Sequence, residues 1–79
     1  MTSIYSAEYR EALDLLKAAR KSARVTQQEL ADAIGRPQSF VSKYERGERR
    51  LDVVEFFRIC RLVRADPFPL LKRIDANMD

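Results

Sequence analysis

The sequence contains no histidine, one cysteine, two glycines and three prolines in 79 residues. Without histidine, the most common general acid–base group and metal ligand is missing. The single Cys60 excludes a disulfide within the chain. It stands in an apolar run, so we expect a buried thiol in a reducing cytoplasm. So few glycines and prolines leave room only for short loops, which favours an all-helical fold.

Several other signals are missing. No apolar run approaches the roughly 20 residues that span a bilayer, and no secretory signal is visible. Gly35 and Gly47 stand alone, so a glycine-rich phosphate loop is not formed. The carboxylates are placed as helix caps and surface charges. We therefore expect no enzymatic activity, no cofactor, no metal ion and no membrane contact, and there is no room for a separate effector domain that would bind a small molecule.

The charge that is present is basic. The net charge is +3 and the pI is about 9.4, as expected of a nucleic-acid binder, although many small soluble domains are equally basic. The distribution says more than the total. Residues 36–50 hold five basic and two acidic side chains, an excess equal to that of the whole chain. This segment is the first candidate for contact with a polyanion.

Apolar spacing and capping residues predict five helices with short links, at about residues 7–23, 26–34, 37–46, 53–65 and 67–77. Thr26 with Glu29 forms a capping box, and Asp52 with Glu55 can cap the fourth helix. Gly35 suits the positive φ that ends a helix. Residues 1–6 are assigned to an N-terminal tail and residues 7–77 to one domain.

The last two helices carry more apolar side chains than a monomer of this size readily buries. They either fill the core or join two subunits. In the second case, we expect a homodimer through the fifth helix, with the tail, where Ile4 and Tyr5 are apolar, as a further candidate.

The third predicted helix has two distinct faces. Phe40, Val41 and Tyr44 lie on one side. Within roughly 140° on the other side of a helical wheel lie five polar residues: Gln38, Ser39, Ser42, Lys43 and Arg46. Glutamine pairs with adenine, lysine with guanine, and serine with either. A solvated face is the alternative, but the two serines are mediocre helix formers there, which favours base reading.

These features resemble the phage-repressor and Cro-like helix-turn-helix family, also called the XRE family. The resemblance runs from Leu13 to Leu71. It rests on Leu16, Arg20, Thr26-Gln27-x-Glu29-Leu30-Ala31, Ile34-Gly35, Val41-Ser42 and Glu45-x-Gly47. It implies a compact, five-helix domain of the lambda-repressor type, with the second and third helices forming the helix-turn-helix.

The resemblance also implies residue roles. Arg20 and Glu45 match a buried structural pair, and Gln27 matches a phosphate contact that braces Gln38. Base contacts are implied for Gln38, Ser39 and Lys43, with Ser42 between them. Backbone phosphate contacts are implied for Arg36, Arg46 and Arg49, and more weakly for Arg50, which is equally well explained as an exposed charge.

Two residues depart from the family pattern. Pro37 stands where a capping serine or threonine is usual, which leaves the start of the third helix open. Phe40 occupies a position that is often small, and could pack on the core, touch a thymine methyl or contact a partner.

The sequence thus predicts a sequence-specific regulator of transcription that binds double-stranded DNA, most simply as a repressor dimer on a palindromic operator. The alternative is a helical protein-interaction module on the same fold, such as an antitoxin-like or adaptor subunit.

Overall fold

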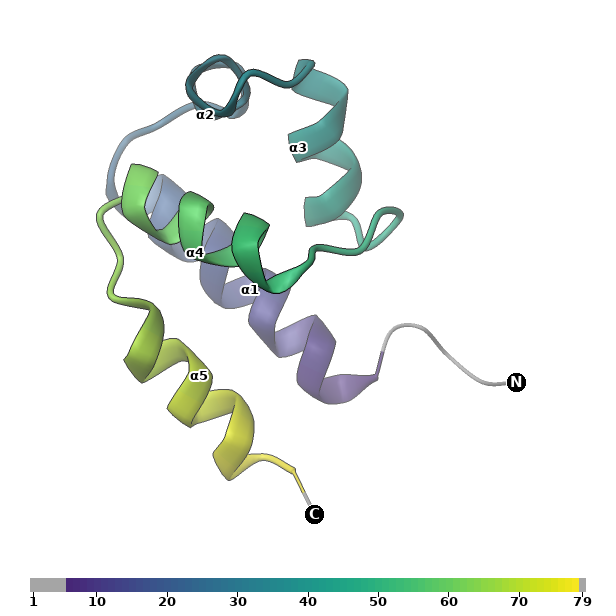
Figure 1. Ribbon diagram of the computed structural model, residues 1–79. Helices are drawn as coiled ribbons and strands as arrows, with labels where there is room; N and C mark the ends of the chain where they lie inside the picture. The colour runs from purple at the N-terminus through teal and green to yellow at the C-terminus, as the bar shows by residue number, and fades with distance from the viewer. Residues whose placement is uncertain (1–5, 79) are drawn as a thin grey trace.

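The computed structural model describes residues 6–78, which form five helices joined by short links and no strand (Figure 1). The helices are α1 (Ala7–Ser22), α2 (Gln27–Ile34), α3 (Gln38–Glu45), α4 (Val53–Leu62) and α5 (Pro67–Ala76). The predicted all-α, five-helix fold is therefore confirmed. Residues 1–5, including Ile4 and Tyr5 of the tail, lie outside the described residues.

The predicted helix boundaries are close to the observed ones, except at the end of α4. The helix was expected to reach residue 65, but it ends at Leu62 because Arg64 adopts φ 60°, in the left-handed region. The amide of Ala65 then donates to the carbonyl of Cys60 (2.8 Å), which closes the helix end. An arginine in this conformation gives no sequence signal, since glycine usually occupies such positions.

Side-chain caps fix the starts of four helices. Both predicted capping boxes are present, at Thr26–Glu29 and at Asp52–Glu55. Ser6, which we had assigned to the tail, accepts a hydrogen bond from the amide of Tyr9 and caps α1. Asp66 likewise accepts from the amide of Phe68 at the start of α5. Only α3 starts without a side-chain cap, because Pro37 precedes it.

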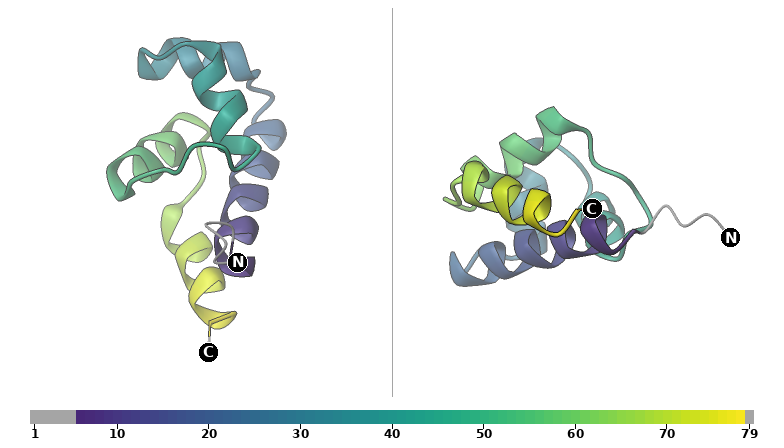
Figure 2. Two further views of the ribbon diagram at one scale, coloured as in Figure 1. Left: turned by 90° about the vertical axis from the view of Figure 1, so that its right-hand side faces the viewer. Right: turned by 90° about the horizontal axis from the view of Figure 1, so that it is seen from below.

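The core lies where α1 to α4 meet, at one end of the molecule, and α5 runs beside α1 at the other end (Figures 1 and 2). The core side chains are less than 4% exposed: Leu13, Leu16, Leu30, Ala31, Val41, Tyr44, Ile59, Cys60 and Val63. Burial raises the pKa of the Cys60 thiol to about 11, so the thiol is uncharged at neutral pH. This packing holds α2 and α3 firmly against α1.

Helix α5 differs from the others because none of its residues is buried. Glu11 of α1 accepts hydrogen bonds from Arg73 (3.0 Å) and Asn77 (2.8 Å), which fasten α5 by its polar side. Phe68 remains 65% exposed and Leu71 36% exposed. The apolar surplus expected from the sequence is therefore located on α5 and its surroundings.

None of the helices in residues 6–78 has the length and apolar character needed to cross a membrane. No group of three or more acidic, cysteine or histidine side chains gathers in this range in a way that could hold a metal ion.

The core contains one polar atom whose replacement should raise stability. Tyr44 is fully buried, and its hydroxyl has no hydrogen-bond partner among residues 6–78. A buried hydroxyl without a partner costs free energy relative to water, so Tyr44→Phe is expected to raise the free energy of unfolding by about 1 kcal/mol. Urea unfolding of both proteins would measure the change. A loss of stability would show that the hydroxyl is satisfied in solution.

Candidate nucleic-acid interface

Helix α3 presents one polar face to solvent. Gln38, Ser39, Lys43 and Arg46 are exposed and Ser42 is half-buried, while Phe40, Val41 and Tyr44 are buried on the opposite side. Because the buried residues anchor α3 to the core, the polar side chains project from a helix that is held in place. A rigid, protruding helix with such a face matches the width of a DNA major groove.

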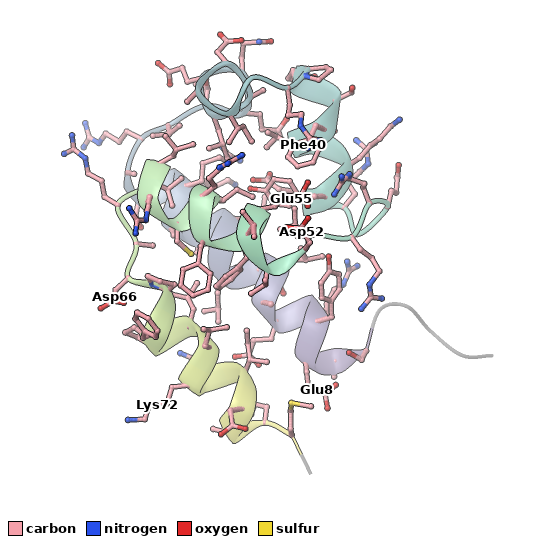
Figure 3. The ribbon with its side chains drawn as sticks, in the orientation of Figure 1. Glu8, Phe40, Asp52, Glu55, Asp66 and Lys72 are labelled. Atoms are coloured by element: carbon pink, nitrogen blue, oxygen red, sulfur yellow. The ribbon has the colours of Figure 1, made fainter. Side chains whose placement is uncertain are left out.

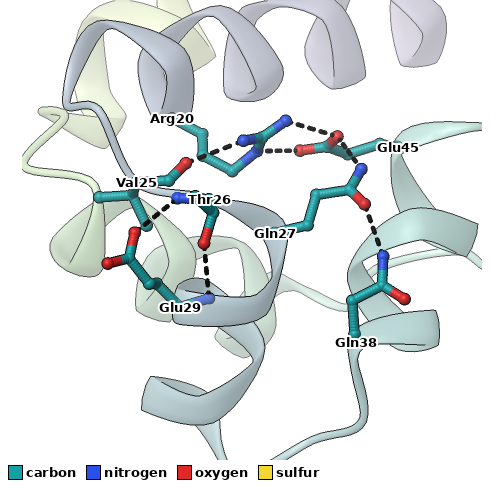
Figure 4. Close-up of polar contacts among 7 residues, drawn as sticks. All are labelled: Arg20, Val25, Thr26, Gln27, Glu29, Gln38 and Glu45. Atoms are coloured by element: carbon teal, nitrogen blue, oxygen red, sulfur yellow. Dashed lines mark hydrogen bonds and ion pairs between the residues drawn. The ribbon is translucent and has the colours of Figure 1, made fainter.

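Behind this face, a chain of hydrogen bonds joins α1, α2 and α3 (Figure 4). Arg20 donates from Nε to Glu45 (2.7 Å) and from Nη2 to its other oxygen (3.1 Å), and both side chains are buried. A third donor of Arg20 reaches the carbonyl of Val25 (2.8 Å). The hydrogen bond from Arg20 to Glu45 raises the pKa of the guanidinium, which stays charged. The sequence resemblance had implied this pair.

Gln27 extends the chain to the polar face. Its amide nitrogen donates to Glu45 (2.9 Å), and its amide oxygen accepts from the amide nitrogen of Gln38 (2.7 Å) (Figure 4). The side chain of Gln38 therefore has a fixed orientation. Its oxygen and its second N–H remain for an outside partner, so it can offer one acceptor and one donor side by side.

The basic residues beside α3 have acidic partners that the sequence reasoning did not assign. Arg46 pairs with Glu48 (2.9 Å) and also contacts Ser42. Arg36 and Arg49 both pair with Glu55, at 3.3 Å and 2.9 Å. A carboxylate two residues after Arg46 was visible in the sequence. Glu55 was expected only as a cap of α4. Its ion pairs with Arg36 and Arg49 could not be predicted from the residues next to it in the sequence.

Arg50 and Phe40 also have defined surroundings. The guanidinium of Arg50 lies 4.6 Å from the ring centre of Tyr9, whose hydroxyl accepts a hydrogen bond from the amide of Leu51 (3.0 Å). Phe40 is only 7% exposed, and the centre of its ring lies 5.7 Å from the centre of the Tyr44 ring. Of the three possibilities for Phe40, core packing is the one observed.

The fold and this face define the class of the protein: a helix-turn-helix domain, with α2 and α3 as its two helices. The helix-turn-helix family model matches residues 16–67. A solved structure titled "XRE-family like protein from Pseudomonas syringae pv. tomato str. DC3000" is 53% identical, with a TM-score of 0.86, and the match covers 96% of this chain and 93% of that one. A search of curated proteins finds no match.

The chain therefore belongs to the XRE family of helix-turn-helix DNA-binding regulators. The family resemblance deduced from the sequence is confirmed.

Proposed function

We propose that this protein is a sequence-specific transcriptional regulator of the cytoplasm, most simply a repressor, which binds a palindromic operator as a homodimer. The observation that carries the proposal is the exposed face of α3, where Gln38 is held in one orientation through Gln27 and Glu45. Repression requires only that the bound dimer occupies a promoter. A chain of this size needs no further domain for that.

The donors and acceptors of α3 suggest what each residue reads. Gln38 offers an acceptor and a donor together, which complements N6 and N7 of adenine. Lys43, one turn further, can donate to O6 and N7 of guanine. Ser39 and Ser42 are short side chains that can accept from or donate to a neighbouring base or sugar. These four side chains are assigned to base contacts.

Phosphate contacts are assigned on both sides of α3. Gln27 stands in the first turn of α2, where the N–H groups and the helix dipole favour an anion. On the other side, phosphate contacts are assigned to the arginines of the turn, of the end of α3 and of the loop after it: Arg36, Arg46, Arg49 and Arg50. Such contacts fix the position of the protein on the duplex but carry no base preference.

The two kinds of contact predict different effects of mutation. Gln38→Ala is expected to relax the base preference at one base pair per half-site. It should weaken the free energy of binding to the operator, but not to random DNA, by roughly 1–3 kcal/mol. Arg49→Ala is expected to weaken binding to all DNA sequences by the same factor. It should also lower, by about 1, the magnitude of the slope of the log binding constant against the log salt concentration. Operator fragments would first be selected from random DNA with the wild-type protein. Titrations at several salt concentrations would then compare the variants on operator and random duplexes.

The outcome tests the assignment directly. If both substitutions reduced binding to operator and random DNA by the same factor, the division into base-reading and phosphate contacts would be wrong. If the wild-type protein showed no salt-dependent binding to any duplex, the proposed function itself would fail.

The dimer is proposed on the apolar surface around α5. Leu71, Ile74 and Met78 line a groove of about 370 Å³ together with apolar residues of α1 and α4. Val53 of α4, which also lines the groove, and Phe68 of α5 are each more than 60% exposed. The groove is lined from α1, α4 and α5 and by none of the polar residues of α3, so a second copy can cover it and leave the DNA-binding face free.

The same surface supports the second candidate function, a protein-interaction module, since a different protein could cover it. Retention on heparin and salt-dependent shifting of random DNA distinguish the two. A protein that shows neither, but that binds a protein partner, would favour the interaction module.

A further inference from the structure

Two arginines, one aromatic ring and one carboxylate form a cluster beside α3, which we call the Arg36–Arg49 cluster. Each guanidinium carbon, of Arg36 and of Arg49, lies 4.7 Å from the centre of the Phe40 ring. Glu55 then bridges the two arginines, because one of its oxygens accepts from Arg49 and the other from Arg36. Four separate parts of the fold meet here: the turn, α3, the loop after it and α4.

Phe40 and Glu55 lie between α3 and α4, close to the surface of the domain (Figure 3). Phe40 is almost fully buried, whereas the side chains of Arg36 and Arg49 are 44% and 39% exposed. The buried ring is thus in contact with both charged groups, while parts of both arginine side chains face solvent. Attraction between a guanidinium and the face of an aromatic ring stabilises this arrangement.

The cluster retains an excess of positive charge. Two guanidinium groups stand against one carboxylate. Burial alone would raise the pKa of Glu55, but the amide of Asp52, Arg49 and Arg36 together lower it, so Glu55 is ionised at neutral pH. Each arginine carries five N–H donors and gives only a few of them within the cluster. The remaining donors suit an external anion with several oxygens, such as a phosphate.

We propose that Phe40 and Glu55 are positioning residues that hold Arg36 and Arg49 in advance as one phosphate-binding pair for the DNA backbone beside α3. The inference rests on the proposed function and adds a role to two residues that do not touch DNA. A long side chain loses conformational freedom when it binds an anion. In this protein, the ring and the carboxylate already restrict both side chains in the unbound state, so the pair is expected to bind a phosphate more strongly than two free arginines would.

The test compares two substitutions at residue 40. Phe40→Leu keeps an apolar side chain but removes the ring, and Phe40→Tyr keeps the ring. We expect Phe40→Leu to weaken binding to operator and to random DNA by the same factor, about tenfold. The salt slope should stay near that of wild type, since both charges remain. Phe40→Tyr should bind like wild type. All titrations are made well below the melting temperature of each variant.

A double-mutant cycle tests the coupling. Arg49→Ala is measured with phenylalanine and with leucine at residue 40. We expect it to weaken binding less in the Phe40→Leu background, because Arg49 is no longer held there. Strictly additive effects would overturn the proposal. So would equal losses in Phe40→Leu and Phe40→Tyr, or a Phe40→Leu protein that melts earlier but binds DNA as tightly as wild type.

These outcomes are distinct from a failure of the proposed function. If wild type binds no DNA, the function is wrong. If wild type binds DNA and Phe40→Leu binds equally well, only the positioning role is wrong, and the cluster serves to tie α3 to α4.

Discussion

Arg20→Ala is expected to lower the free energy of unfolding by roughly 3–5 kcal/mol. The side chains of Arg20 and Glu45 are 9% and 2% exposed, and the substitution would leave the carboxylate of Glu45 buried without its positive partner. Only the neutral amide of Gln27 would still donate to it. Small domains are stable by about 5–15 kcal/mol, so a large part of the total stability would be lost. Urea unfolding followed by circular dichroism measures the change.

Two control variants separate the buried charge from other causes. Arg24→Ala removes an exposed arginine four residues away and should change stability little. The double variant Arg20→Met with Glu45→Leu removes both charges and should recover much of the loss, because no charge is left buried alone. An Arg20→Ala protein as stable as wild type would contradict the prediction. A double variant as unstable as Arg20→Ala would assign the effect to packing.

We expect the pair to affect DNA binding as well. Glu45 holds Gln27, and Gln27 holds Gln38, so the orientation of the Gln38 amide, which we propose reads a base, depends on the buried carboxylate at the other end of α3. The double variant lacks this support even where its stability recovers. Its preference for the operator over random DNA should therefore be weaker than that of wild type, which links one core contact to specificity.

The sequence predicted most of the fold because the fold is built from local signals. The Thr26–Glu29 box and Gly35 mark the two ends of α2 within ten residues, and the apolar spacing of α3 separates its buried face from its polar one. Such patterns are set by neighbouring residues alone. The family motif then placed Arg20 opposite Glu45, a contact across 25 residues that no local rule provides.

Most of the unpredicted features depend on tertiary contacts. Glu55 looked like a helix cap, and it is one, but the same oxygen that caps α4 also accepts from Arg49. The burial of Phe40 could not be separated from its alternatives, because its surroundings come from the turn, the loop and α4. Arg64 ends α4 early through a backbone conformation that arginine rarely adopts. For Glu55 and Phe40 the deciding partners lie on other elements of the fold, whereas the end of α4 is decided locally at Arg64.

Phe68→Glu is expected to convert the proposed dimer into a monomer and to weaken operator binding by about 10²–10⁴-fold. Phe68 is 65% exposed, so the monomer loses little packing, although its edge contact with Phe57 (5.9 Å) is changed. In the dimer, binding of one half-site brings the second subunit to the other half-site at high effective concentration. A charged side chain in an apolar interface has no partner and is strongly unfavourable there.

The measurement combines mass in solution with DNA titration. Wild type should show twice the chain mass of 9.2 kDa, and Phe68→Glu a single chain. Binding to a single half-site should be almost unchanged in the variant, because α3 is untouched. Lys17→Gln makes the same change in net charge at an exposed position of α1 and serves as the control. A Phe68→Glu protein that stays dimeric and binds the operator as tightly as wild type would show that the dimer interface does not lie on this part of α5. A wild-type protein that is monomeric and still binds its operator tightly would show that operator binding does not require a dimer.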